Sequence, residues 1–127
     1  MTTSRPKRIL LVEDEEDALE LMQWWVEEQG FDVRTARSGE AALDIGKTFK
    51  PDFLVTDYLL QDDLTGADVI DRLRTADGNV RCVLVTGVLQ NALTLDAQRL
   101  SGVPILTKPF DFKRLGALLS SADGEMD

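Results

Sequence analysis

The amino-acid sequence predicts an α/β fold, a doubly wound parallel sheet in which five strands alternate with five helices. Short apolar runs, several of them rich in β-branched side chains, recur along the chain and are typical of strands. Segments of helical length, with apolar side chains three or four positions apart, separate these runs. Because strands with nearly continuous apolar sequence are buried on both faces, helices are expected to cover both faces of the sheet.

The five strands follow from the apolar runs, and a helix fills the interval after each strand. Strands are expected at Arg8–Val12, Phe31–Ala36, Asp52–Thr56, Arg81–Thr86 and Val103–Leu106. Helices are expected at Glu15–Gln29, Gly66–Thr75, Asn91–Leu100 and Asp111–Ala122. A further helix is expected after Ser38, which is suited to cap it. No repeat, low-complexity tract or internal linker interrupts this alternation, and 127 residues correspond to one domain.

The first predicted helix carries an apolar stripe that is expected to face the sheet. The stripe consists of Ala18, Leu21, Met22, Trp25 and Val26. Gly30 is suited to end the helix, and Leu19 and Trp24 then point partly outward. An exposed Trp is a candidate for a protein interface, although packing flat on neighbouring side chains explains it nearly as well.

The other predicted helices carry similar stripes. Asp111 is suited to cap the last of them. The stripes consist of Ala42, Ile45, Gly46 and Phe49, then Ile70 and Leu73, then Leu93, Ala97 and Leu100, and finally Phe112, Leu115, Leu118 and Leu119.

Composition and charge exclude several classes of function. The net charge of −9 argues against direct contact with nucleic acid or an anionic membrane, because both repel an acidic protein. The absence of histidine excludes a Ser-His-Asp triad, histidine metal ligation and a phosphohistidine on this chain. The single cysteine, Cys82, lies in an apolar run and is expected to be a buried, inert thiol in a reducing cytoplasm. The apolar run Ile9–Val12 is too short for a signal peptide or a membrane span.

Polar residues follow four of the five predicted strands. These strand ends are Glu13-Asp14, Thr56-Asp57, Thr86-Gly87 and Thr107-Lys108. The carboxyl ends of parallel strands meet at one edge of a sheet, where open α/β proteins bind their ligands. The sequence therefore predicts a site with three carboxylates, a hydroxyl group and an ammonium group.

This combination of groups suits phosphoryl transfer. Three clustered carboxylates stay ionised only beside a compensating cation, and Mg²⁺ (or Mn²⁺) suits a few carboxylates plus a phosphoryl group. Lys108 supplies a mobile positive charge, the Thr86 hydroxyl is a hydrogen-bond donor, and Gly87 leaves room for the incoming group. Asp57 is the candidate nucleophile, which would form an aspartyl phosphate.

Each of these residues also has an ordinary structural explanation. Glu13 and Asp14 would complement the dipole of the first helix, Asp57 would cap a turn, and Lys108 would be a solvated surface residue. Taken singly, these explanations are the stronger ones. Four separate strand ends that each deliver the required type of residue favour the functional interpretation.

Four stretches of the sequence resemble the receiver domain of bacterial two-component response regulators. These are Ile9–Glu15, Val55–Asp57, Leu84–Gly87 and Thr107–Phe110, and the resemblance extends over roughly Lys7 to Ser120. It implies a flavodoxin-like (βα)5 fold with strand order 2-1-3-4-5. It also implies a single receiver domain over residues 1–127, with a core over about residues 7–120 and short polar and acidic tails.

The resemblance implies a role for each residue of the predicted site. Asp57 would accept a phosphoryl group from the phosphohistidine of a sensor histidine kinase or a histidine phosphotransfer protein. Thr86 would be the switch hydroxyl, Lys108 would contact the phosphoryl group, and the peptide bond before Pro109 would be cis. The metal ligands would be Glu13, Asp14, Asp57 and the backbone carbonyl of Leu59. Such a domain catalyses its own phosphorylation and dephosphorylation and is not an enzyme that turns over an external substrate.

The sequence departs from this family at several positions. Gln61 stands where the family usually has Pro, and the loop is one residue longer before Gly66, so a more mobile loop is expected. Ile105 replaces the usual aromatic switch residue and is unable to use the same ring rotation. Leu59 and Val88 are apolar where a hydrolytic water would approach, so an altered phosphoryl lifetime is expected.

The resemblance also implies protein partners. The family face for a downstream protein target, or for a homodimer, corresponds to about Asn91–Ser120, and the first helix, with Trp24, would dock on the kinase. No output domain is expected after Ala122, where the sequence continues with the acidic tail Asp123–Asp127. A stand-alone receiver and a receiver cut from a longer protein, such as a hybrid kinase, both remain open.

Three alternatives are weighed against this interpretation. The first is a degenerate receiver that binds proteins without being phosphorylated, which the complete set of site residues disfavours. The second is an enzyme of the haloacid-dehalogenase type, which needs a second Asp where Leu59 stands. The third is a nucleotide-binding domain, for which no Gly-rich phosphate loop is present.

Overall fold

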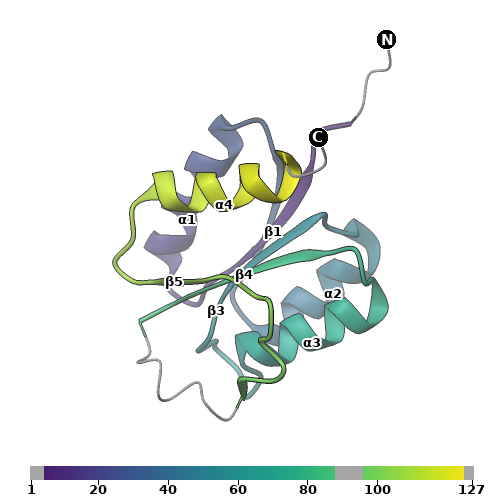
Figure 1. The fold of residues 1–127 in the computed structure, drawn as a ribbon. Coiled ribbons are helices and arrows are strands. Elements are labelled where there is room, and N and C mark those ends of the chain that lie inside the picture. The colour runs from purple at the N-terminus through teal and green to yellow at the C-terminus, as the bar shows by residue number, and fades with distance from the viewer. Residues whose placement is uncertain (1–4, 88–95, 125–127) are drawn as a thin grey trace.

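A computed structural model describes residues 5–87 and 96–124 of the chain, and describes side chains as far as Ser120 (Figure 1). The described residues form five strands and four helices, which alternate except that β5 follows β4 with no described helix between them. In chain order these are β1 (Arg8–Val12), α1 (Glu16–Glu28), β2 (Asp32–Ala36), α2 (Gly39–Phe49), β3 (Phe53–Asp57), α3 (Gly66–Ala76), β4 (Arg81–Thr86), β5 (Ile105–Thr107) and α4 (Phe112–Gly124).

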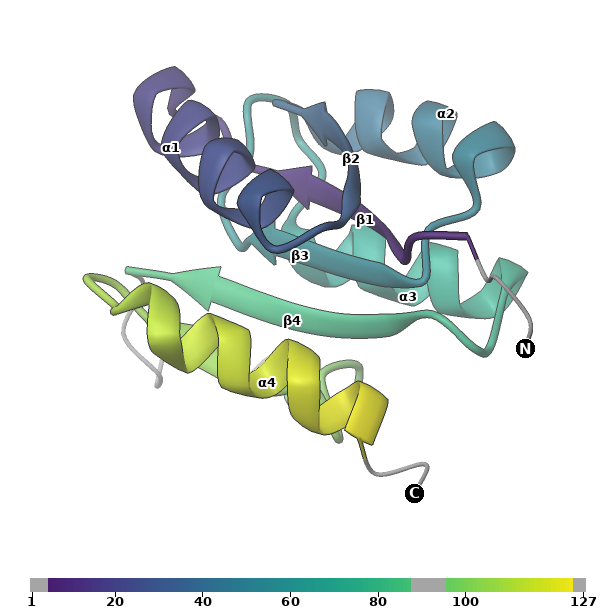
Figure 2. The same cartoon turned by 90° about the horizontal axis from the view of Figure 1, so that it is seen from above.

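The five strands form one parallel sheet with the order β2-β1-β3-β4-β5. Helices α1 and α4 cover one face of this sheet, and α2 and α3 cover the other (Figures 1 and 2). The central strand β3 is buried along its whole length, as its uninterrupted apolar sequence predicts. The predicted fold class and strand order are therefore confirmed.

Two hydrophobic cores lie on opposite faces of the sheet. Alternate residues of each strand supply them, because successive side chains of a strand point to opposite faces. Leu10 and Leu54 pack with α2 and α3, whereas Ile9 and Val55 pack with α1 and α4. The sheet is thus sandwiched between helices, and its carboxyl edge is left for the site.

The apolar face of α1 differs from the prediction at two leucines. Leu19 is buried with 6% of its surface exposed, whereas Leu21 is 55% exposed. Leu19 shares the face of Met22 and Val26, three and seven positions on, and this face meets the sheet. The prediction was wrong in placing Leu21 in the core and Leu19 outward. Trp24 is exposed, as predicted.

Side-chain caps start the other three helices, and the sequence predicts two of them, Ser38 and Asp111. The Ser38 hydroxyl accepts a hydrogen bond from the Ala41 N–H at the start of α2. A capping box between Thr65 and Asp68 starts α3. The Asp111 carboxylate accepts a hydrogen bond from the Lys113 N–H before the first turn of α4.

The predicted helix Asn91–Leu100 lies mostly outside the described residues. Its described part, residues 96–100, forms a short turn-rich segment that leads towards β5. Leu100 is buried in the core beneath this segment. The other predicted strands and helices agree with the structure to within a few residues at their ends.

Among the helices of the described residues, none has both the length and the apolar character that a membrane crossing requires.

Cys82 lies in β4 and is buried, as the sequence predicts. Burial raises the pKa of its thiol from the ordinary value of 9.0 to about 12. The thiolate fraction at pH 8 therefore falls by about a thousandfold, and native protein should react with a thiol reagent only as it unfolds. Labelling kinetics with and without urea test this expectation, and fast labelling of the native protein would contradict it.

Candidate functional site

The register of the sheet brings four strand ends to one edge. Val12 of β1 lies beside Thr56 of β3, Asp57 lies beside Val85 of β4, and Thr86 lies beside Thr107 of β5. The residues at and just after these positions therefore share the carboxyl edge of the sheet, where open parallel sheets bind ligands.

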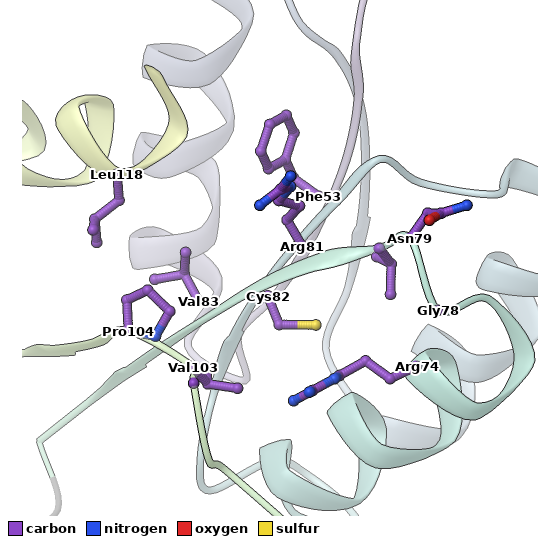
Figure 3. Close-up of a pocket in the computed structure, with 12 residues that line it drawn as sticks. Phe53, Arg74, Gly78, Asn79, Arg81, Cys82, Val83, Val103, Pro104 and Leu118 are labelled. Carbon is purple, nitrogen blue, oxygen red and sulfur yellow. The ribbon is translucent and has the colours of Figure 1, made fainter. Parts of the chain in front are cut away.

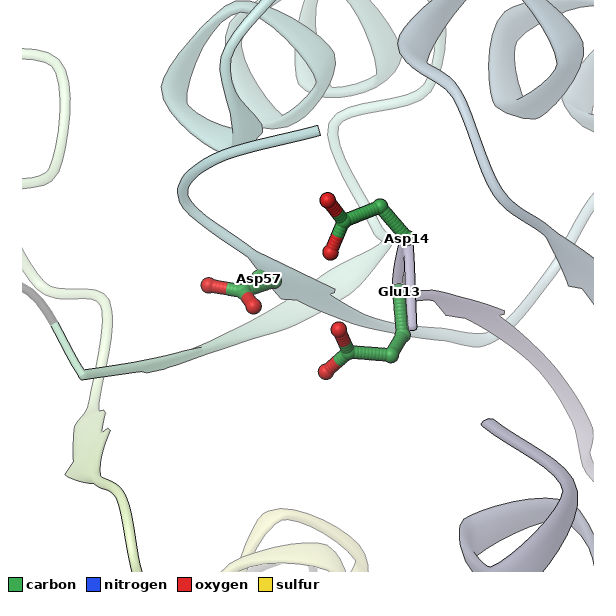
Figure 4. A group of neighbouring side chains, drawn as sticks. All are labelled: Glu13, Asp14 and Asp57. Carbon is green, nitrogen blue, oxygen red and sulfur yellow. The ribbon is translucent and has the colours of Figure 1, made fainter. Parts of the chain in front are cut away.

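Three carboxylates meet at this edge. Glu13 and Asp14 come from the end of β1 and Asp57 from the end of β3, and the side chains converge in Figure 4. One carboxylate oxygen from each residue lies within 4.8 Å of the others. Glu13 is 2% exposed and Asp57 is also buried, whereas Asp14 is partly open to solvent.

Lys108 brings a positive charge from the loop after β5. Its Nζ donates hydrogen bonds to Glu13 Oε1 at 2.6 Å and to Asp57 Oδ2 at 2.8 Å. The Lys108 N–H also donates to the Thr86 carbonyl at 2.9 Å, and the following peptide bond to Pro109 is cis. The lysine therefore bridges two of the three carboxylates.

The electrostatics of the site leave an excess of negative charge. Burial raises the pKa of Glu13, although its hydrogen bond from Lys108 acts in the opposite direction, and repulsion by Asp57 adds to the rise. Burial by itself would lower the pKa of Lys108, but its hydrogen bonds to Asp57 and Glu13 outweigh this and raise it. Three carboxylates beside one ammonium group favour a further cation.

The carboxylate of Asp57 is held in place by two donors. Its Oδ1 accepts a hydrogen bond from the Tyr58 N–H at 2.6 Å, and its Oδ2 accepts the bond from Lys108. Thr86 is buried at the adjacent strand end. A Cβ atom added to Gly87 would lie 4.0 Å from the Lys108 Cβ, an ordinary van der Waals distance, so the space beside Gly87 is not crowded.

The other residues singled out in the sequence lie around this centre or away from it. Leu59 is an exposed side chain just beyond Asp57, and Ile105 packs against the core beside β4. Trp24 lies on the exposed surface of α1. Val88 falls outside the described residues.

The structure adds residues that no sequence pattern indicated. The Arg37 guanidinium donates two hydrogen bonds to the backbone carbonyl of Asp14, at 2.9 and 3.2 Å. The Tyr58 hydroxyl donates to Asp96, and Arg99 bridges Asp96 and Asp68. The hydrogen bond to Asp96 raises the pKa of Tyr58 to about 12. Because these contacts join segments that are far apart in the sequence, no local sequence motif predicts them.

An apolar groove of about 430 Å³ opens beside the carboxylates. The exposed Leu21 of α1 and the aromatic rings of Phe110 and Phe112 line it, and Glu13 and Lys108 lie at its margin. The groove thus leads from the surface of α1 to the charged centre.

A second pocket, of about 480 Å³, lies at the opposite edge of the sheet, where β4 begins. Arg74, Arg81, Cys82 and Val103 are among the residues that line it (Figure 3). It is separated from the carboxylates by the length of β4 and takes no part in the site described above.

Glu13 provides a test of what it costs to bury a carboxylate in this cluster, since burial is the main cause of its raised pKa. The folded state raises the pKa of Glu13 above its ordinary value of 4.5. The contribution of Glu13 to the free energy of unfolding is therefore complete below pH 4.5, where the side chain is protonated, and is lost as the pH rises through the folded-state pKa. In EDTA, Glu13→Gln should therefore be more stable than the parent protein at pH 7, with the difference closing below pH 4.5. Urea unfolding at both pH values measures the two stabilities. A stability difference between variant and parent that is the same at both pH values would contradict this prediction.

A model of the response regulator receiver domain matches residues 9–120 of the chain. The chain therefore belongs to the receiver domain family of two-component response regulators. Members of this family are signalling modules and not enzymes that turn over an external substrate, and they act with sensor kinases.

Two relatives illustrate the similarity. The chain is 34% identical over 87% of its length to the alkaline phosphatase synthesis transcriptional regulatory protein PhoP of Bacillus subtilis. It is 31% identical over 94% of its length to the acid tolerance regulatory protein ActR of Rhizobium meliloti. The chain matches 46% and 61% of these two proteins, so it spans about half the length of the curated relatives.

Solved structures show the same fold. A signal receiver domain of an HD domain-containing protein from Pseudomonas fluorescens superposes with a TM-score of 0.86 at 24% identity, over 96% of this chain and 90% of that one. The response regulator TrrA of Thermotoga maritima was solved in complex with Mg²⁺-BeF. It superposes with a TM-score of 0.80 at 25% identity, over 91% of this chain and 98% of that one.

Proposed function

We propose that Asp57 is the phosphoacceptor of a Mg²⁺-dependent phosphoryl transfer that switches a protein-interaction surface. The observation that carries this proposal is the convergence of Glu13, Asp14, Asp57 and Lys108 at one edge of the sheet. We propose that residues 7–120 form the core of this receiver domain.

The Asp57 carboxylate is the nucleophile. One of its oxygens attacks the phosphorus of a partner's phosphohistidine, a new O–P bond forms, and the N–P bond breaks with its electron pair returning to the imidazole. The Tyr58 N–H, bonded to Asp57 Oδ1, orients the carboxylate for this attack. Because these 127 residues contain no histidine, the phosphohistidine that serves as donor lies outside them.

The residues at this edge fit a hard divalent cation. The carboxylates of Glu13, Asp14 and Asp57 supply oxygen ligands, and their excess negative charge needs a cation. The backbone carbonyl of Leu59 is proposed as a further ligand. When bound, Mg²⁺ (or Mn²⁺) neutralises charge on the transferring phosphoryl group and holds it beside the nucleophile. The TrrA structure solved with Mg²⁺-BeF supports this proposal.

Lys108 and Thr86 act on the phosphoryl group once it arrives. The ammonium group of Lys108 exchanges its hydrogen bond with Asp57 for one with a phosphoryl oxygen, since both partners are anionic. The Thr86 hydroxyl turns towards the same group, and Gly87 leaves space for it. This movement is the proposed switch, with the aliphatic Ile105 in place of an aromatic partner.

The groove beside α1 is the proposed docking place for the phosphodonor. A sensor histidine kinase or histidine phosphotransfer protein would cover Leu21, Phe110 and Phe112 and bring its phosphohistidine to the charged margin. The exposed Trp24 extends this surface along α1. A downstream protein or a second copy would bind the face that includes β5 and α4, and the compartment is proposed to be the cytoplasm.

Incubation with a small acyl phosphate tests the proposed function. With Mg²⁺, intact-mass measurement should reveal one added phosphoryl group, and excess EDTA should prevent it. A receiver that only binds proteins would remain unmodified although calorimetry detects Mg²⁺ binding. That outcome would contradict the phosphoacceptor role of this site.

A further inference from the structure

The loop between β3 and α3 is attached to the start of α2 by one side chain. The Asp62 carboxylate accepts a hydrogen bond from the Gly39 N–H at its Oδ1 and from the Glu40 N–H at its Oδ2, both at 2.9 Å. Burial acts to raise the pKa of Asp62, but these N–H groups outweigh it and hold the pKa below its usual range. A carboxylate with both oxygens occupied has little rotational freedom, so Asp62 fixes its own stretch of the loop.

A second contact joins the same loop to the candidate metal site. The Gln61 N–H donates to the Arg37 carbonyl at 3.4 Å, and the Arg37 guanidinium donates twice to the carbonyl of Asp14. Arg37 therefore lies between the loop after β3 and the loop after β1. Both of these loops carry proposed metal ligands.

Packing and backbone pairing complete the attachment. A Cβ atom added to Gly39 would lie 2.5 Å from the Leu64 Cβ, so the leucine lies directly on the start of α2. Leu59 and Thr65 form an antiparallel bridge that closes the base of the loop. The loop is thus held at its base and at its tip, where the proline common in the family is replaced by Gln61.

We propose that Asp62 is a positioning residue for the metal site, because it fixes the loop that carries the Leu59 carbonyl and, through Arg37, the loop that carries Asp14. This inference rests on the proposed function, since it concerns the metal of that site. A loop fixed before the metal binds loses little conformational freedom on binding, whereas a loosened loop loses more, and the affinity falls.

Asp62 also acts as a cap for α2, so the test must separate the two roles. The Ser38 hydroxyl already accepts the Ala41 N–H at this helix end, and it remains when Asp62 is replaced. The adjacent Asp63 is exposed, and its side chain has no hydrogen bond to any other residue in the described part of the chain. Asp63→Ala therefore removes the same charge from the same loop and leaves the attachment intact.

The experiment is calorimetric titration of Mg²⁺ into the full chain and three variants, with the thermal unfolding midpoint in EDTA measured alongside. Asp62→Ala should bind Mg²⁺ about tenfold more weakly, at the lower end of the range for residues that support metal ligands. Asp62→Asn, which keeps one acceptor oxygen, should be intermediate. Asp63→Ala should bind as the parent does.

The outcomes distinguish this inference from the proposed function. Equal Mg²⁺ affinity in Asp62→Ala and Asp63→Ala would overturn the inference. This holds if the loss of one charge weakens binding in both variants, and also if neither variant binds more weakly than the parent. If Asp62→Ala lowers the unfolding midpoint but leaves the Mg²⁺ affinity unchanged, Asp62 acts only as a cap of α2, and the inference is again overturned. Failure of the parent protein itself to bind Mg²⁺ would instead contradict the proposed function and, with it, the inference.

Discussion

Asp57→Asn is expected to abolish the phosphoryl adduct altogether. An amide oxygen is a far weaker nucleophile than a carboxylate, and the substitution keeps the size and the N–H contact of the side chain. The loss should exceed about a thousandfold in rate, the scale of removing an essential nucleophile. Intact-mass measurement after incubation with an acyl phosphate and Mg²⁺ gives the result directly.

Asp63→Asn is the matched control for this substitution. It makes the same chemical change at an exposed aspartate six positions further along the chain. The control should be phosphorylated at the parental rate, with an unchanged unfolding midpoint. Adduct formation in Asp57→Asn at the parental rate would show that another carboxylate is the acceptor.

Gly66→Ala is expected to have the largest effect on stability. A Cβ atom at this position would lie 2.1 Å from the backbone oxygen of Asp57 and 3.0 Å from the Leu84 side chain. The Gly66 N–H also donates to the Tyr58 carbonyl at 2.7 Å, so moving the first turn of α3 away would stretch this hydrogen bond. The substitution should cost about 3 kcal/mol or more, as overpacking against fixed backbone does.

The same substitution should also disturb the proposed acceptor, because the clash falls on the backbone of Asp57 itself. Urea unfolding measures the stability, and the rate of adduct formation measures the acceptor geometry. Gly78→Ala is the control, since nothing lies within 4 Å of a Cβ atom there. Stability of Gly66→Ala within about 0.5 kcal/mol of the parent, the range of ordinary surface changes, would contradict the observed packing.

The fold followed from the sequence because its signals are local and repeated. Each strand is a short apolar run, and the burial of β3 on both faces is what such a run predicts. The exchange of Leu19 and Leu21 marks the limit of this reasoning. Both leucines fit an apolar stripe, and only the placement of α1 against the sheet decides which one is buried.

The centre of the site was predictable for a related reason. A parallel sheet aligns its carboxyl ends, so residues such as Glu13, Asp57 and Lys108 converge once the strands are known. The contacts of Arg37 and Asp62 were not predictable, because each joins loops more than twenty residues apart. A surface arginine or aspartate has no local pattern that reveals its partner.

Tyr58 connects the proposed acceptor Asp57 to a second set of hydrogen bonds, which matters because Ile105 stands where an aromatic switch residue was expected from the family resemblance. Its N–H donates to Asp57, and its hydroxyl donates to Asp96 in the segment before β5. Asp96 and Arg99 carry the contact on to Asp68 in the first turn of α3. The described residues therefore contain a series of hydrogen bonds that runs from Asp57 through Tyr58 to Asp96, Arg99 and Asp68.

Location of the phosphoryl group on the chain tests the central claim most directly. Reduction of the phosphorylated protein with borohydride converts an aspartyl phosphate to homoserine, and peptide mass spectrometry then identifies the residue. We predict that the modified residue is Asp57, that it requires Mg²⁺, and that no other carboxylate is converted. Conversion of a different residue, or none with Mg²⁺ bound, would contradict the account.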